Sequence, residues 1–292
     1  MLGPGMSAAS SCLKWQSPSD QPSEDQSKLD KAVNLLPEEV SRAYQSARQQ
    51  VPRLVSIETP AAAFLVASNG DIHAAARSIA QHWKKRKELF GKRAFLPMTA
   101  TGKGSLTNGD LEVFKSGVFV QLSNDSAGRL VFGFDRSRLS QDFDDIHGLA
   151  DNLLRCVFYV MVSALPSDTT KSFILLVICS PAFEPSTEDP ALLRGIHEIS
   201  HSSMPFGYHA TRMAFLIPRS DRKRFIEQVI PTARRSTNEC APKDKLKLEV
   251  MIGRTKNKLL QQLIDSGLEE SGIPVVIGGK CFHLFEGDSP AD

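Results

Sequence analysis

The chain has 292 residues, of which 41% are hydrophobic and 23% are charged, so it is long enough to bury a substantial core. Its 35 Lys and Arg against 33 Asp and Glu leave a formal charge of +2, which argues against a protein that coats nucleic acid. The longest apolar stretches, Cys156 to Leu165 and Phe173 to Cys179, are far shorter than the roughly 20 residues of a membrane-spanning helix.

The N-terminal composition and the cysteine spacing indicate where the protein acts. Ser, Pro, Gln and Asp dominate the start of the chain, so residues 1–30 are expected to form a disordered tail without a secretory leader. The 5 cysteines are widely spaced and include no C-x-x-C pair, which favours a reducing, cytoplasmic location and predicts no disulfide framework.

Helical spacing dominates the first ordered part. Apolar residues recur every three or four positions between Val40 and Leu54, and Pro52 and Pro60 punctuate the end of this stretch. A second helix is predicted after Asp71, a suitable N-cap, with Gly91 closing it. Seven basic residues and one acidic residue lie between Arg77 and Arg93, which favours a solvated helix face, with an interaction surface as the alternative.

Strands alternate with helices after a polar connector at residues 102–108. A hairpin is predicted with strands at 117–122 and 129–135, and the continuous apolar run at 172–180 has the pattern of a strand covered on both faces. Further strands are expected at 211–217 and 246–252, and helices at 145–165, 189–202, 219–235 and 255–266. This order predicts an α/β fold, with a mostly parallel sheet flanked by helices and an N-terminal all-helical lobe. The expected domains are the lobe at 31–100, the sheet unit at 101–286 and a tail at 287–292.

One short motif raises the possibility of a zinc enzyme. The segment from His197 to His201 reads H-E-I-S-H, which fits the H-E-x-x-H pattern of zinc metallopeptidases, in which the glutamate acts as base. The metzincin continuation fails, because Met204 and Gly207 occupy the positions of its glycine and its third histidine. We therefore favour an ordinary crossover helix, expect no metal, and keep a zinc peptidase as the alternative.

The sequence contains none of the other common catalytic or nucleotide-binding motifs that we considered. Neither a P-loop, a G-x-S-x-G elbow nor a G-x-G-x-x-G after a strand is present, so we expect no cofactor and no enzymatic activity.

The 219–235 helix combines basic and apolar residues, which suits a helix that lies on an anionic membrane surface. The alternative is an ordinary amphipathic helix whose basic face is exposed to solvent. Its apolar residues are Phe225, Ile226, Val229 and Ile230. Its basic residues include Arg222, Lys223, Arg224, Arg234 and Arg235.

Four motifs, taken in order, resemble the CRAL-TRIO lipid-binding family over roughly Glu38 to Phe285. The first is an F-L-x-A stretch followed by an Ala-rich helix that ends in Trp83-Lys84-Lys85-Arg86-Lys87. The second is a D-x-x-G-R hairpin at 125–129, and the third is a short strand that ends at Pro218. The fourth is the segment Ile273-Pro274-Val275-Val276-Ile277-Gly278-Gly279. The hairpin has Leu130 in place of the family's usual proline, and the asparagine often found before Pro218 is absent.

The resemblance implies an apolar pocket on a bent sheet, closed by a mobile gate helix, here the 219–235 segment. It implies a hydrophobic lipid as ligand, transient contact with anionic membranes, and a cytoplasmic, peripheral and monomeric protein. The expected lipid-binding wall consists of Phe132, Phe134, Phe158, Phe173, Leu175, Met213 and Phe215, and the gate residues are Phe225, Ile226, Val229 and Ile230. Headgroups are expected to meet the five basic residues named above.

The ligand itself is not specified by the sequence. Some family members bind phosphatidylinositol through charged residues that have no residue-by-residue match here. A ligand-free interaction module, with its pocket filled by its own Phe and Leu side chains, is a further alternative.

Overall fold

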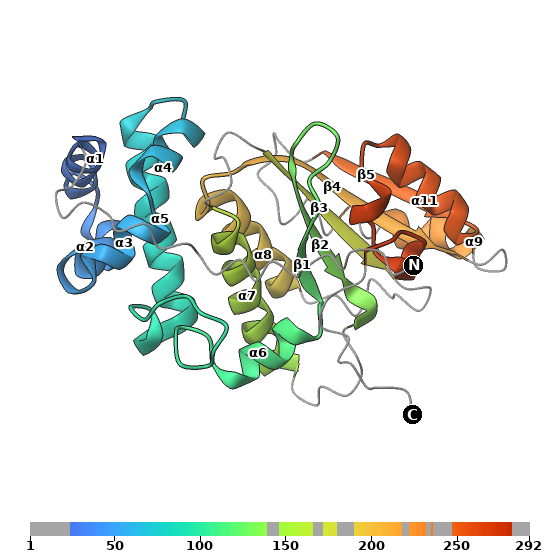
Figure 1. The fold of residues 1–292 in the computed structure, drawn as a ribbon, viewed down its shortest axis with the longest axis horizontal. Helices are drawn as coiled ribbons and strands as arrows, with labels where there is room; N and C mark the ends of the chain where they lie inside the picture. Colours follow the sequence, from blue (N-terminus) through green and yellow to red (C-terminus); the bar gives the residue numbers. More distant parts are fainter. Residues whose placement is uncertain are drawn as a thin grey trace, which may run out of the picture.

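The computed structural model describes residues 24–138, 146–165, 172–179, 190–217, 222–231, 235 and 247–281. A helical lobe lies at one end, and a five-stranded sheet with helices on both faces forms the rest of the molecule (Figure 1). The predicted α/β fold with a mostly parallel sheet is confirmed.

The helical lobe has its own core. Its helices are α1 (Glu24–Asn34), α2 (Glu38–Gln50), α3 (Pro52–Glu58), α4 (Ala61–Ala67) and α5 (Ile72–Phe90). They pack around the buried side chains of Tyr44, Phe64 and Trp83. Pro52 opens a new helix because its ring fixes φ and it has no amide to donate. Because α1 begins at Glu24 and buries Leu29 completely, the lobe starts earlier than the predicted boundary at residue 31.

Both ends of α5 follow the sequence prediction. The Asp71 carboxylate accepts hydrogen bonds from the amides of His73 and Ala74, at 2.9 and 3.0 Å. Gly91 ends the helix with φ 54°, a conformation that other residues rarely adopt, and a short turn, η1 (Gly91–Arg93), follows.

Two arginines of the basic stretch hold residues 94–107, a segment longer than the predicted connector and called the connector from here on, instead of facing solvent. Arg86 is fully buried, pairs with Glu58 of α3, and donates to the carbonyls of Ala94 and Leu96 at 2.6 Å each. Arg93 donates to the connector carbonyls of Gly102 and Leu106, at 2.6 and 2.8 Å. The predicted solvated face therefore describes only part of this stretch.

A helix that the sequence did not predict, α6 (Asn108–Lys115), follows the connector. It begins with a capping box in which Thr107 and Asp110 exchange hydrogen bonds. The buried Asp110 carboxylate also accepts a hydrogen bond from Arg155 Nε, at 2.7 Å, and so fixes α6 to the next long helix, α7 (Ile146–Ser163).

The sheet has the order β1-β2-β3-β4-β5. Its strands are β1 (Phe119–Leu122), β2 (Leu130–Asp135), β3 (Ser172–Cys179), β4 (Gly207–Leu216) and β5 (Leu248–Gly253). β1 and β2 form the predicted hairpin and pair antiparallel, and the other neighbours pair parallel. The apolar run at 172–180 is the central strand β3, as predicted. β4 starts at Gly207, earlier than the predicted Thr211.

Helices cover both faces of the sheet. α7 and α8 (Pro190–Ser202) lie between the sheet and the helical lobe, and α11 (Lys256–Asp265) covers the opposite face (Figure 1). Shorter elements complete the described part: η2 (Arg136–Arg138), α9 (Arg222–Arg224), the π-helical turn η5 (Phe225–Val229), η6 (Glu270–Gly272) and η7 (Val275–Ile277). After η7, Gly278 adopts φ 101°, and a Cβ on Gly279 would lie 1.9 Å from the carbonyl oxygen of Ile273.

Candidate hydrophobic ligand site

The sheet brings the predicted wall residues together on one face. In the parallel register, Phe132 pairs with Leu175 and Phe134 with Val177. On the other side of β3, Val177 pairs with Met213 and Cys179 with Phe215. These side chains therefore point to the face covered by α7 and α8, where they form one apolar cluster with Phe158 of α7. The sequence alone could not decide which face of each strand packs against α7 and α8. The observed register of the sheet decides it.

Aromatic rings of this wall contact one another. Phe132 stacks on Phe119 with ring centroids 6.0 Å apart, and its other ring neighbours are Phe173 at 5.8 Å and Phe206 at 6.3 Å. Phe132 and Phe173 are no more than 1% exposed. A ligand tail on this face would have to displace some of these ring contacts.

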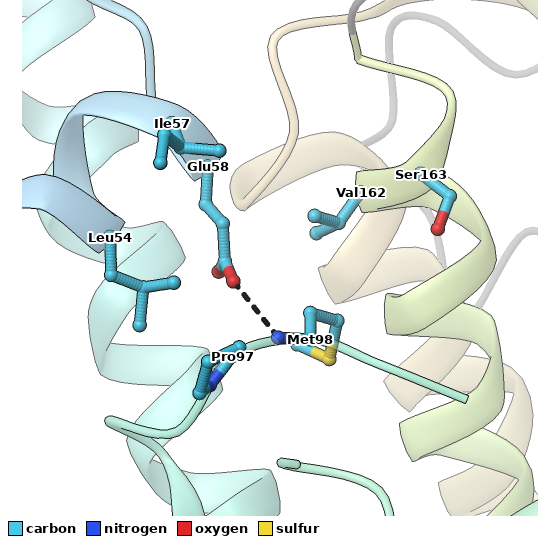
Figure 2. A pocket seen from close by; sticks show the side chains of 7 residues that line it. All are labelled: Leu54, Ile57, Glu58, Pro97, Met98, Val162 and Ser163. Carbon is cyan, nitrogen blue, oxygen red and sulfur yellow. Dashed lines mark hydrogen bonds between the residues drawn. The ribbon is translucent and has the colours of Figure 1, made fainter. Parts of the chain in front are cut away.

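A small cavity lies at a different place, between α3, the connector and the end of α7 (Figure 2). Its lining is mostly apolar, with the Glu58 carboxylate accepting a hydrogen bond from the amide of Met98 at 3.3 Å. The volume of about 20 Å³ suits a single water molecule and is too small for a lipid tail.

The predicted gate helix differs from an ordinary amphipathic α-helix. After the short α9, the chain winds as the π-turn η5, so its residues do not follow the 3.6-residue period of an α-helix. Phe225 is 3% exposed, with its ring centroid 5.3 Å from that of Phe215, whereas Ile226 is 45% exposed. Ile230 is half-buried. The predicted single apolar stripe is therefore wrong for Phe225 and Ile226, which point in different directions.

The structure describes the side chains of three of the five basic residues that were expected to meet lipid headgroups. Lys223, Arg224 and Arg235 are exposed. The side chains of Arg222 and Val229, and the whole of Arg234, lie outside the described residues.

The H-E-I-S-H motif of α8 places its histidines and its glutamate against different partners. The rings of His197 and His201 lie with centroids 3.9 Å apart, and the His201 ring is 4.6 Å from that of Tyr208 on β4. Glu198 forms an ion pair with Lys85 of α5, with 2.7 Å between Oε2 and Nζ. Within the part of the chain that the structure describes, no three His, Cys, Asp or Glu side chains are placed to hold a metal ion.

Burial keeps the side chains of His197 and Tyr208 uncharged. Desolvation lowers the pKa of His197, against a smaller opposing effect of Glu198, and desolvation raises the pKa of Tyr208. His197 is thus a neutral imidazole at neutral pH, and Tyr208 keeps its phenolic proton.

Sequence reasoning missed Tyr208 and Thr211, which lie on the wall face beside these histidines. The Tyr208 hydroxyl donates to Thr211 Oγ1 at 2.8 Å. Thr211 alternates with Met213 and Phe215, so the strand pattern could have placed it on the wall. Tyr208 fell outside the predicted strand.

Comparison with known proteins gives no family for this chain. No protein-family model matches it, and no curated protein matches it. Among the described helices, none combines the length and the apolar character needed to cross a bilayer.

Proposed function

We propose that the protein binds a hydrophobic lipid against the wall face of the sheet, behind the gate formed by α9 and η5. The observation that carries the proposal is the apolar face shared by four adjacent strands, on which Phe225 of the gate rests through its contact with Phe215. The motifs that resemble the CRAL-TRIO family support the same function.

Energetics favour a carrier with a gate over spontaneous exchange of lipid through water. Each buried methylene contributes about 0.8 kcal/mol, so a chain of roughly 16 carbons would lose on the order of 13 kcal/mol on entering water. Moving the Phe225 ring off Phe215 costs only about 2 to 3 kcal/mol, the free energy of burying one such side chain. The gate would then be open on the order of one per cent of the time.

The outer side of the gate suits an anionic membrane surface. Lys223, Arg224 and Arg235 are exposed there, and Ile226 offers an exposed apolar side chain. Each basic residue near an anionic surface contributes about 1 kcal/mol, and an apolar side chain adds insertion into the interface. We therefore propose peripheral, salt-sensitive docking through this segment.

Lipid extraction tests the proposal directly. The purified full chain, incubated with vesicles of mixed lipids and re-isolated, should carry a lipid that mass spectrometry detects in near-stoichiometric amount. Protein that stays empty would refute lipid binding.

Charge reversal tests the docking surface. The pair Arg222→Glu and Lys223→Glu should weaken binding to phosphatidylserine vesicles strongly at low salt and weakly at high salt, because salt screens exposed charges. Arg77→Glu, a reversal at an exposed arginine of α5 in the helical lobe, is the matched control and should have little effect. An equal effect of both reversals would refute docking through the gate.

The ring contacts of Phe132 favour a second candidate, an interaction module whose own side chains fill the site. In that case the protein stays empty in the extraction experiment, and Phe132→Ala destabilises it without affecting any lipid.

A further inference from the structure

The wall face has one polar location in an otherwise apolar surface. Thr211 lies in the middle of a row that crosses four strands, and it is 8% exposed. The other members of its row are Phe132, Leu175 and Leu248. The next row contains Phe134, Val177, Met213 and Val250 and has no polar side chain.

One polar side chain contacts Thr211 directly, and two more lie beside that neighbour. Tyr208 donates its hydroxyl hydrogen to Thr211 Oγ1 at 2.8 Å, and its ring centroid lies 5.4 Å from that of the wall residue Phe173. His197 and His201 of α8 lie beside Tyr208, with ring centroids 6.4 and 4.6 Å from it. We call His197, His201, Tyr208 and Thr211 the polar spot.

The polar spot has hydrogen-bonding capacity that the described protein does not use. His197 Nε2 is buried and has no hydrogen-bond partner within the described residues. The Thr211 hydroxyl accepts from Tyr208, and its own hydrogen is donated to no described group. A buried polar atom without a partner costs about 1–3 kcal/mol, so native proteins rarely keep one without a use.

We propose that the polar spot binds the uncharged, hydroxyl-bearing end of a lipid whose hydrocarbon tail lies along the wall face. This inference rests on the proposed function and specifies its ligand class. Apolar pockets commonly use a few convergent polar groups to fix the orientation of a ligand. A hydroxyl can donate to the imidazole nitrogen of His197 and accept from Thr211, which satisfies both groups.

The surroundings of the polar spot disfavour an anionic end group. Within the described residues, His197, Tyr208 and Thr211 form no hydrogen bond or ring contact with a Lys or Arg side chain. A buried carboxylate or phosphate without a cation is costly, whereas a hydroxyl is not once it is hydrogen-bonded. The spot should therefore select an alcohol over both a hydrocarbon and a fatty acid of equal length.

A competition between three lipids of equal chain length tests this selection. The full chain is incubated with phosphatidylcholine vesicles that carry equal amounts of octadecanol, stearic acid and octadecane, then re-isolated, and the bound lipids are quantified by mass spectrometry. The wild type should enrich octadecanol over octadecane on the order of tenfold, the value of about one good hydrogen bond.

Two variants and a control separate the polar spot from a general change in core packing. Thr211→Val and His197→Phe keep size and shape, and each should reduce the enrichment several-fold while octadecane uptake is unchanged. Leu263→Met changes a buried residue of α11 on the opposite face of the sheet at similar volume and should preserve the enrichment. Circular dichroism and thermal unfolding verify that each variant is folded, and either folded variant suffices for the test.

The outcomes distinguish this inference from the proposed function. Equal uptake of all three lipids, a preference for stearic acid, or an unchanged enrichment in the folded variants would overturn the polar spot while leaving lipid binding intact. A wild type that takes up none of the three would overturn both.

Discussion

Acidification should destabilise this protein through one buried histidine, His82. It lies where α5 of the helical lobe packs against α7 and α8, it is fully buried, and its ring centroid is 4.9 Å from that of Phe158. Its Nδ1 lies 2.8 Å from the carbonyl oxygen of Ser203, which can only accept, so Nδ1 carries the hydrogen. Its Nε2 is buried and has no hydrogen-bond partner within the described residues. A proton on Nε2 would place a charge in an apolar site.

The size and sign of the effect follow from the pKa of His82. Burial lowers this pKa from 6.5 to about 4, so the unfolded chain binds the proton more readily than the folded protein. The contribution of His82 to stability is fully present above pH 6.5 and is lost as the pH falls towards 4. At about 1.4 kcal/mol per pKa unit, the total loss is about 3 kcal/mol.

Urea titrations over a range of pH measure this loss, with Trp83 of the lobe core as the fluorescent reporter. Between about pH 7 and about pH 4.5, the wild type should lose on the order of 2 to 3 kcal/mol more unfolding free energy than His82→Phe, which cannot be protonated. The variant should be slightly less stable at neutral pH, because the Ser203 carbonyl loses its donor. Parallel pH curves for wild type and variant would refute the assignment of the acid sensitivity to His82.

Three other changes should have distinct effects. Phe225→Ala removes the ring that rests on Phe215 in the proposed gate, so release of bound lipid from the protein to acceptor vesicles should accelerate at least about tenfold in a fluorescence transfer assay. Arg86→Met leaves the Glu58 carboxylate buried without its cation and should lower the unfolding free energy by about 3 to 5 kcal/mol in urea titration. Gly253→Ala places a Cβ 2.4 Å from Leu259 Cβ and 2.8 Å from its backbone nitrogen, so calorimetry should show a lower Tm, equivalent to about 1 to 3 kcal/mol.

Matched controls make each of these results decisive. Ile226→Ala changes an exposed gate residue and should leave lipid release unaltered, so equal acceleration by both gate variants would contradict the role of Phe225. Adding Glu58→Gln to Arg86→Met should recover part of the lost stability, and no recovery would contradict an unpaired charge as the cause. Gly195→Ala meets only the flexible end of Leu154, at 2.7 Å, so a larger loss there than at Gly253 would show that the packing argument fails.

Sequence patterns predicted the elements whose signals are local. The central strand β3 was predictable because a short unbroken apolar run is typical of a strand covered on both faces. Asp71 and Gly91 marked the ends of α5 because capping depends on a few adjacent residues. The period of two predicted which residues of β2 and β4 share a face, but the face that packs against α7 and α8 was set only by the register of the sheet.

Features that depend on distant partners were not predictable. The burial of Phe225 depends on its contact with Phe215 on the finished sheet, which no local periodicity records. His82 lies in a basic stretch that has the pattern of a solvent-exposed helix face. It is buried through contacts such as the one with Phe158, which lies far along the chain. The polar spot required the register between β3 and β4, including the irregularity near Phe173 that aligns it with Tyr208. The short α6 was hidden because Asn108-Gly109 has the pattern of a turn.

The arginine contacts of the connector affect how relatives of this protein can diverge. Most of the contacts of Arg86 and Arg93 are to main-chain carbonyl oxygens, which every amino acid supplies, so the exposed side chains of residues 94–107 can change while the path of the backbone is kept. The buried Ser105 is different, because its hydroxyl also accepts a hydrogen bond from Arg86, at 3.0 Å. Selection should therefore act on the two guanidinium groups and on the buried Ala94, Ser105 and Leu106, and tolerate wide variation at the exposed positions of the segment. Distant homologues would then share this backbone path without sharing its amino-acid sequence.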